Sequence, residues 1–420
     1  MASIKQRGNG YQITVSCGYS SDGKKIVKTT TWTPPDGLTP RQVDKALEQA
    51  TAEYEKKVKT GQFMDDNITL SEYTDRWLTE YAEKHLEETT LYSYRMALDS
   101  KILPALGHIR LGKLQPVQIL SFLNNLLEDG VRKDGKAGGY SNRTVKYMHQ
   151  ILSSMLQQAV YWQIIPSNPC ERVKPPAKKD LGKGKLKHFT EEQAIRFLEA
   201  VQGEETKYQL LAYIGIFGGS RKGEMLGLTW DDVDLEKGML NIDKAGTYTP
   251  EKGLFIKDTK NHGSTRCISL PDNVLALLKQ HKREQAEQRM KLGELWQNNN
   301  LVFTQWNGMQ MHTSTPRQWM NRFISKYNDG VTKSDTITDK EKEAMKLPAI
   351  PFHGLRHTSA TLLIASNTDI RTVSARLGHA QTSTTMNIYS HALQNSDRKA
   401  ADTLQTLLGK RKDNQEKQVE

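Results

Sequence analysis

The sequence predicts a multidomain protein that is mainly α-helical and carries small β-sheets. Its 420 residues exceed the length of one ordinary domain, so two to four domains are expected. Strand-like runs lie near the N-terminus, a purely helical pattern follows between residues 69 and 169, and the remainder mixes helices with short strands. These patterns predict a sheet-and-helix module, a helical bundle and a larger mixed α+β domain.

The charge balance favours a polyanionic partner. The chain has 59 Lys and Arg against 48 Asp and Glu, a net charge of +11, which indicates nucleic acid first and an anionic membrane second. The longest apolar stretch, residues 210–217, is too short to span a bilayer, and no apolar run follows Lys5 and Arg7 as a signal peptide would require. We therefore reject the membrane alternative.

The cysteines argue against a disulfide framework and against a zinc site. Cys17, Cys170 and Cys267 lie far apart and form no CxxC or Cys/His ligand pattern. A reducing, cytoplasmic setting is therefore expected, and no metal.

The N-terminal module reads as a small sheet followed by one helix. Residues 11–19 and 25–32 are strand-like, and Ser21-Asp22-Gly23 supplies turn residues between them. A helix is expected to begin at Thr39-Pro40 and to stop at Gly61. Such a sheet can lie in a DNA groove with its basic face, although an ordinary solvated face is also open. The candidate DNA-binding residues here are Lys5, Arg7, Lys24, Lys25 and Lys28.

The next segment predicts four helices. Thr69 caps the first, the second follows Thr89 and ends near Pro104, Pro116 opens the third, and Ser141 starts the fourth. The fourth helix turns one apolar face inward, formed by Val145, Met148, Ile151, Leu152, Met155 and Leu156. Arg143 and Lys146 at its start are further candidate DNA-binding residues.

Residues 174–187 read as a basic linker, because Pro and Gly forbid a long helix there and the lysines keep the segment solvated. A plain tether and a segment that follows the phosphate backbone both remain open. The tail, residues 409–420, is expected to be disordered. Between the linker and the tail we expect helices at 190–201, 206–217, 271–288, 314–327, 353–366 and 396–407, and strands near 239–243 and 265–269.

Five basic residues and one tyrosine in this last region could carry chemistry. Transfer of a phosphodiester needs permanent positive charge on two non-bridging oxygens, a nucleophile, and a proton donor for the leaving oxygen. Arginine forks, a tyrosine oxygen, and a lysine or histidine meet these needs without a metal or another cofactor. Singly each signal is weak, since a lone tyrosine is more often a packing aromatic. The set comprises Arg221, Lys260, His353, Arg356, His379 and Tyr389.

The order and surroundings of these residues resemble the tyrosine recombinase (phage integrase) family. The block HGLRHTSATLLIASNTDIRTVSARLGHAQTSTTMNIYSHAL, residues 353–393, is similar to the family's C-terminal catalytic block, and SRKGEMLGLTWDDVDL is similar to its first-arginine box. Residues 67–170 resemble its core-binding domain, and the first 60 residues resemble the sheet-based arm-type DNA-binding module of mobile-element integrases.

The resemblance implies a role for each matched position. Arg221 and Arg356 would clamp the scissile phosphate, His353 would assist proton transfer, and His379 would hydrogen-bond a phosphate oxygen. Tyr389 would form a 3′-phosphotyrosyl link, so no ATP is implied. Glu224 would orient the cluster from behind. Lys260 would protonate the leaving 5′ oxygen, but the hairpin before Arg266 is longer than the common pattern, which leaves Lys257 as an alternative.

The resemblance also implies a domain plan. Residues 1–62 would form an arm-type DNA-binding domain with a three-stranded sheet plus a helix. Residues 67–173 would form the SAM-like helical core-binding domain. Residues 188–408 would form the mixed α+β tyrosine-recombinase catalytic domain.

The function expected is that of an integrase, a DNA strand transferase that inserts and excises a mobile element. Its partners would be double-stranded DNA with core and arm sites, three further copies in a tetramer on DNA, and excision or DNA-bending accessory proteins. The setting would be the bacterial cytoplasm, in association with the nucleoid. The alternatives are a chromosome-dimer resolvase or inversion recombinase, a type IB topoisomerase, and a DNA-binding regulator on a decayed integrase scaffold.

Overall fold

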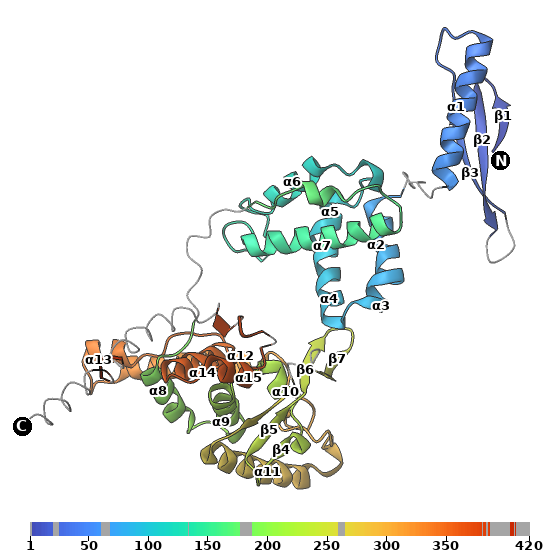
Figure 1. Cartoon of the computed structure of the whole chain (residues 1–420). Helices are drawn as coiled ribbons and strands as arrows, with labels where there is room; N and C mark the ends of the chain where they lie inside the picture. Colours follow the sequence, from blue (N-terminus) through green and yellow to red (C-terminus); the bar gives the residue numbers. More distant parts are fainter. Residues whose placement is uncertain are drawn as a thin grey trace, which may run out of the picture. The chain divides into compact units, whose positions relative to one another are not determined.

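The computed structural model describes most of the chain and divides it into two compact units, Met1–Lys183 and Gly184–Glu420 (Figure 1). Each unit is considered by itself. The described residues are 2–19, 25–59, 68–132, 134–176, 187–258, 265–379, 381–383, 385, 386, 404–406 and 408.

The N-terminal module is a three-stranded antiparallel sheet in the order β1-β2-β3, covered on one face by a helix (Figure 1). Ile13 and Val15 are each 1% exposed and form its core with Leu47. The three-stranded sheet predicted for this module is confirmed. The elements are β1 (Ser3–Arg7), β2 (Gly10–Tyr19), β3 (Lys25–Trp32) and α1 (Pro40–Lys59).

The second part of the first unit is entirely helical. Thr69 caps its first helix in a capping box with Glu72, and Ser141 caps its longest helix, as predicted. All six residues predicted to face inward from that longest helix are buried. The α-helices are α2 (Leu70–Trp77), α3 (Glu83–His85), α4 (Glu88–Ala97), α5 (Leu103–Leu106), α6 (Pro116–Asn125) and α7 (Asn142–Tyr161).

The second predicted helix of this bundle ends near Pro104, as expected. It begins at Glu88 and passes through a wide π-helical turn, Leu98–Ile102, before it ends at Leu106. Pro104 therefore lies in the last turn of this helix, two residues before its end.

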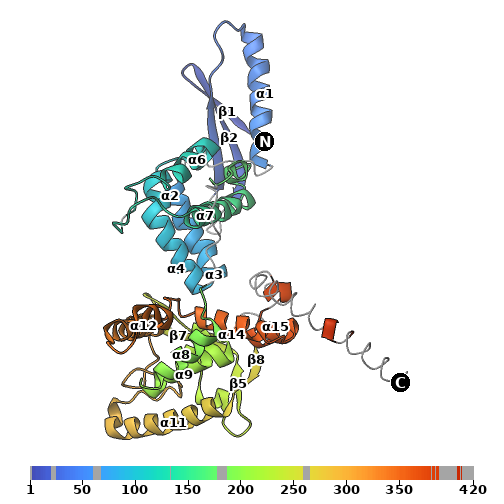
Figure 2. The same ribbon diagram turned by 90° about the vertical axis from the view of Figure 1, so that its left-hand side faces the viewer.

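The second unit consists mainly of helices and contains two small sheets. One sheet has the order β4-β5-β8, and the other is the hairpin β6-β7. Its helices are α8 (Glu191–Val201), α9 (Thr206–Tyr213), α10 (Lys222–Leu226), α11 (Asp272–Leu292), α12 (Thr315–Lys333), α13 (Asp339–Met345), α14 (Gly354–Ala365) and α15 (Ile370–Leu377). Its strands are β4 (Val233–Asp234), β5 (Met239–Ile242), β6 (Lys244–Thr249), β7 (Gly253–Asp258) and β8 (Arg266–Ser269). Helices α14 and α15 contact each other, and β8 contacts α15 (Figure 2).

Most predicted elements of this unit are present, but there are several differences, among them the short strand β4, which was not predicted. The predicted helix 206–217 is divided into α9 and a π-helical turn, Ile214–Gly218. The hairpin β6-β7 and helix α13 were not predicted. Of the predicted helix 396–407, only residues 404–406 lie within the described residues, and these are helical.

Candidate active site

Arg221 lies at a junction between two helices of the second unit. After the π-helical turn, Gly219 takes a left-handed conformation with φ of 60°. A side chain in that conformation costs about 1–2 kcal/mol, so the turn favours glycine. The chain then places Arg221 at the N-cap of α10 with its side chain 38% exposed.

Arg356 is fixed beside this junction. It lies in the first turn of α14 and is 2% exposed. Its Nη1 atom donates a hydrogen bond to the carbonyl oxygen of Gly219 at 2.7 Å. α14 can approach the π-helical turn because Gly215 has no side chain, and a Cβ there would lie 2.9 Å from Leu355.

His379 reaches the same place from the end of α15. Gly378 ends that helix in a left-handed conformation with φ of 65°. Arg221 donates a hydrogen bond from Nη2 to the carbonyl oxygen of Gly378 at 3.0 Å. The Nδ1 atom of His379 lies 2.7 Å from Oγ1 of Thr385, which is completely buried. Gly378, the residue before His379, is thus hydrogen-bonded to Arg221 through its carbonyl oxygen.

Glu224 is buried beneath the arginines. Its carboxylate accepts hydrogen bonds from the backbone N–H of Arg221 at 2.8 Å and from Nη1 of Arg221 at 2.6 Å. It also accepts bonds from Nη2 and Nη1 of Arg266, at 2.8 and 3.2 Å. Burial by itself raises the pKa of Glu224, but the bonds from Arg266 and then Arg221 outweigh it and lower the pKa. Glu224 is therefore a carboxylate that holds Arg221 in place.

The histidines of the cluster are held neutral. Burial, followed by the charges of Arg356, Arg221 and Arg266, lowers the pKa of His379 to about 4. Burial and the charges of Arg356 and Arg221 also lower the pKa of His353, whose ring lies 4.8 Å from that of His357. Because His353 is exposed by surface area, the nearby arginines are the more important cause for this residue. A neutral imidazole can donate one hydrogen bond and accept another.

The sequence reasoning missed two arginines that complete the cluster. Arg266 begins β8, and its side chain is 7% exposed. It donates from Nε to the carbonyl oxygen of Arg376 at 2.7 Å. Arg376 in turn donates from Nη2 to the carbonyl oxygens of Phe217 and Ser269, at 2.5 and 3.0 Å. Each of these bonds joins segments far apart in the chain, so no local pattern reveals them.

Two of the six predicted catalytic residues, Lys260 and Tyr389, lie outside the described residues. Lys257, the alternative to Lys260, lies in β7 opposite Ala245. The structure therefore brings together Arg221, Arg356, His353 and His379, with Glu224 behind them.

The predicted DNA-binding residues are distributed over separate surfaces. Lys5 and Arg7 share one face of the N-terminal sheet, whereas Lys28 pairs with Val15 and so lies on the face that the helix covers. Lys24 and the side chain of Lys25 lie outside the described residues. Arg143 and Lys146 are both exposed and lie three residues apart on α7.

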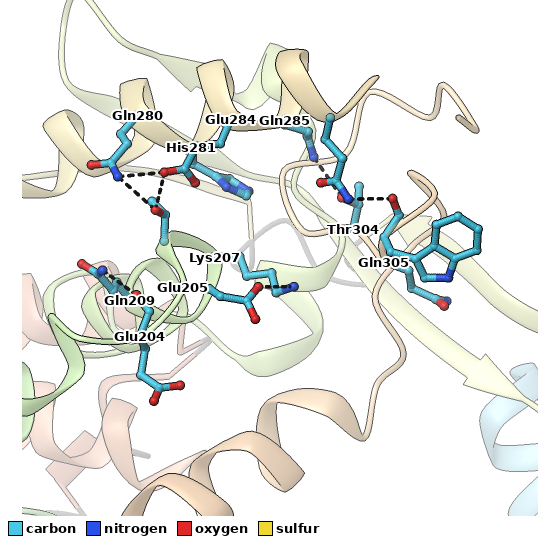
Figure 3. Close-up of a pocket in the computed structure, with 13 residues that line it drawn as sticks. Glu204, Glu205, Lys207, Gln209, Gln280, His281, Glu284, Gln285, Thr304 and Gln305 are labelled. Atoms are coloured by element: carbon cyan, nitrogen blue, oxygen red, sulfur yellow. Dashed lines mark hydrogen bonds and ion pairs between the residues drawn. The ribbon is translucent and has the colours of Figure 1, made fainter. Parts of the chain in front are cut away.

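We define the cationic cluster as the four arginines Arg221, Arg266, Arg356 and Arg376. A cavity of about 410 Å³ lies between α9 and α11, and none of its lining residues belongs to this cluster (Figure 3). Its carboxylates are already engaged: Glu284 accepts hydrogen bonds from Thr206 and Gln280, and Glu205 pairs with Lys207. Among the described residues that line the cavity there is no arginine, and the one lysine, Lys207, is the partner of Glu205.

The cluster is suited to an anionic phosphate rather than to a metal ion. It gathers four arginine side chains and a single buried carboxylate, which leaves positive charge for non-bridging phosphate oxygens. Within the described part of the chain, no group of three or more His, Cys, Asp or Glu side chains could hold a metal ion. Among the same residues, no helix has the length and apolar character needed to cross a membrane.

Comparison with known proteins gives clear relatives. Residues 187–396 match the phage integrase family, and residues 69–127 match the phage integrase N-terminal SAM-like domain. A tyrosine recombinase XerC-like protein of Caldanaerobacter subterraneus is 26% identical over 422 residues, covering 96% of this chain and 98% of that protein. The ICEBs1 integrase of Bacillus subtilis is 29% identical over 300 residues, covering 70% and 72%.

Solved structures share the fold. The Tn1549 transposon integrase, in complex with a circular intermediate DNA, gives a TM-score of 0.62 at 18% identity and covers 80% of this chain and 100% of that one. A lambda integrase tetramer bound to a Holliday junction gives a TM-score of 0.51 at 16% identity, covering 90% and 96%.

The fold and the cationic cluster define an enzyme that handles DNA phosphodiesters. The phage integrase match spans half of the chain. The protein therefore belongs to the phage integrase family and is a tyrosine site-specific recombinase.

Proposed function

We propose that this protein integrates and excises a mobile element by cutting and rejoining DNA through a 3′-phosphotyrosyl intermediate. The observation that carries the proposal is the meeting of Arg221, Arg356 and His379 at one place. They come from three separate segments and are joined by hydrogen bonds to the carbonyl oxygens of Gly219 and Gly378.

Arg221 and Arg356 stabilise the phosphate through charge and position. Arginine keeps its proton at any physiological pH, and its planar fork matches two phosphate oxygens. Glu224 and the carbonyl of Gly378 hold the guanidinium of Arg221 before the DNA arrives, so little reorganisation is needed. His379 and His353, as neutral imidazoles, donate hydrogen bonds to a phosphate oxygen or relay a proton.

The reaction itself is a balanced exchange of esters. The oxygen of Tyr389 passes its proton to the neutral imidazole of His353 and attacks phosphorus. A tyrosyl-phosphate bond forms, and the bond from phosphorus to the 5′ oxygen breaks. Lys260 gives its proton to that leaving oxygen, with Lys257 as the alternative donor. Attack by the 5′ hydroxyl of another strand reverses these steps, so the ester bond is retained and no ATP is consumed.

A mobile element is the substrate favoured by the relatives. Those with integrase names include the ICEBs1 integrase and the Tn1549 transposon integrase. The N-terminal sheet module, residues 1–62, is an arm-site reader, a part that a chromosome-dimer resolvase does not need. Residues 67–173 bind the core site, residues 188–408 carry the chemistry, and residues 174–187 join them.

The working assembly is a homotetramer on double-stranded DNA with core and arm sites. The solved structure of a lambda integrase tetramer bound to a Holliday junction supports this proposal. Excision or DNA-bending proteins assist, and the reaction takes place in the bacterial cytoplasm at the nucleoid, where the DNA substrate lies.

The test is Tyr389→Phe on a nicked suicide substrate that traps the covalent intermediate. Removing the phenolic oxygen should abolish the covalent protein–DNA adduct and leave DNA affinity unchanged, since the ring is retained. Tyr161→Phe is the matched control, because Tyr161 is 70% exposed and belongs to the helical domain. Adducts that persist at the normal yield in Tyr389→Phe would refute the nucleophile and the proposed mechanism.

A further inference from the structure

The side chain of Arg266 connects the two segments that carry Arg221 and His379. Its guanidinium donates two hydrogen bonds to Glu224, and its Nε donates a third to the carbonyl oxygen of Arg376 in the last turn of α15. Gly378 lies against the same group, since a Cβ there would be 2.6 Å from Nη1 of Arg266. Arg266 thus contacts both partners that hold the guanidinium of Arg221.

The charges of this contact favour a defined role. Glu224 is 3% exposed and shares its carboxylate between Arg221 and Arg266. A buried carboxylate with a single cationic partner binds that partner more strongly, because the full negative charge acts on it in a medium of low dielectric. Without Arg266, Glu224 would therefore compete with the DNA phosphate for Arg221.

Arg266 begins β8, but its side chain reaches the C-terminal end of α15. This contact gives Arg266 a second, geometric role. Cations are favoured at the C-terminus of a helix, where carbonyl oxygens lack partners within the helix. The bond to the carbonyl oxygen of Arg376 uses one of those oxygens, two residues before Gly378. The carbonyl of Gly378 remains for Arg221.

We propose that Arg266 is a positioning residue for strand cleavage: it neutralises Glu224 so that Arg221 keeps its charge for the scissile phosphate, and it fixes the turn that carries His379. This role rests on the proposed function. Arg266 touches neither the DNA nor the nucleophile in this mechanism. It acts through Glu224 and the Gly378–His379 turn.

The test measures the single-turnover rate of adduct formation and the DNA affinity of the full-length protein. Arg266→Gln should slow adduct formation on the order of 100-fold, because Arg221 would then lose its contact with the transition state, and one lost donor has an effect of this size. The overall DNA affinity should change little, because only one of many phosphate contacts is weakened. Arg266→Lys should fall between Arg266→Gln and the unmodified protein, because it keeps the charge and loses the fork.

The decisive variant is Glu224→Gln combined with Arg266→Gln. Removing the unbalanced carboxylate should recover about 10-fold of the lost rate, a coupling that a purely structural role would not give. Arg376→Gln is the matched control. Its side chain also ties α15 to the domain but does not contact Glu224, so Glu224→Gln should give no recovery in that background.

Two results would overturn the role of Arg266. One is an Arg266→Gln rate close to normal, and the other is a double variant no faster than Arg266→Gln alone. Every assay includes Tyr389→Phe, so failure of the proposed function would appear as adducts that do not depend on Tyr389. Adducts that depend on Tyr389 but not on Arg266 would refute only the inference about Arg266.

Discussion

At the residue scale, the neighbours of His379 decide its protonation. Burial disfavours the charged imidazolium, and the charges of Arg356, Arg221 and Arg266 act in the same direction. The hydrogen bond between Nδ1 and Oγ1 of Thr385 fixes the orientation of the ring. The side chain is therefore a neutral imidazole near pH 7 rather than a further cation of the cluster.

We expect His379 to titrate at about pH 4 in the DNA-free protein. The midpoint can be measured by NMR of labelled histidine, with His379→Asn to assign the signal. The cleavage rate should then show no inflection from this residue between about pH 6 and pH 8. A midpoint near the ordinary value of about 6.5 would contradict the proposed electrostatics.

These lowered values also affect the pH dependence of stability. In the folded protein the pKa of His357 and of His379 is about 4, which is below the unfolded value. Unfolding therefore takes up protons at any pH between the folded and the unfolded pKa. The contribution of these residues to stability is complete above the unfolded value and is lost as pH falls toward about 4.

The sequence could predict the residues of this site that carry a motif. Arg221, Arg356, His353, His379 and Glu224 all stand in recognisable local patterns, and the structure brings them together. Arg266 and Arg376 could not be found in this way, because their partners are backbone carbonyls and a carboxylate brought near only by folding. Thr385 is hidden for the same reason, since its role depends on the orientation of one imidazole.

At the scale of elements, two short turns position the site. The π-helical turn before Gly219 and the left-handed end of α15 at Gly378 each present a carbonyl oxygen to an arginine. Both depend on glycine, because a side chain would be strained by its backbone angle and would meet a neighbouring group. The turns thus fix the side chains of Arg221 and Arg356 in place.

Gly378→Ala should both destabilise the protein and slow cleavage. The left-handed backbone costs about 1–2 kcal/mol with a side chain, and the new Cβ would displace Arg266, only 2.6 Å away. Urea unfolding and the rate of adduct formation measure the two effects.

Gly253→Ala is the matched control for this change. Gly253 has a similar φ of +70°, but no atom lies within 4 Å of the place that its Cβ would take. This variant should lose only the backbone contribution to stability. Equal losses of stability in both variants, with normal cleavage in Gly378→Ala, would show that the contact with Arg266 is unimportant.

Element boundaries were predictable where capping residues mark them. Thr69, Ser141 and Thr190 each cap a helix that begins where the sequence indicated. The hairpin β6-β7 was missed because its strands are mostly half-buried and show little alternation of apolar and polar residues. π-helical turns were missed too, since they depend on tertiary contacts such as that between Gly215 and Leu355.

At the scale of the whole molecule, the described chain has separate hydrophobic cores for separate tasks. One core lies between residues 70 and 173, and another between residues 189 and 355. Neither includes any described residue of the N-terminal module. Each part can therefore keep its own fold when another is removed.

Deleting residues 1–62 should abolish binding to distal arm sites and spare binding to the core site. The reason is that Lys5 and Arg7 are removed, while both larger cores stay intact. DNase footprints on a DNA with both kinds of site measure the outcome. The reciprocal control is Arg143→Glu with Lys146→Glu, which should weaken the core footprint alone. Unchanged footprints after the deletion would assign the module another task.

The carboxylate shared by Arg221 and Arg266 also has a consequence for protein engineering. Because Glu224 and Arg266 balance each other, a scan that changes one position at a time should score both as intolerant. A library that varies the two positions together should recover active pairs that the scan discards. Directed evolution of new site preferences should therefore treat positions 224 and 266 as one unit.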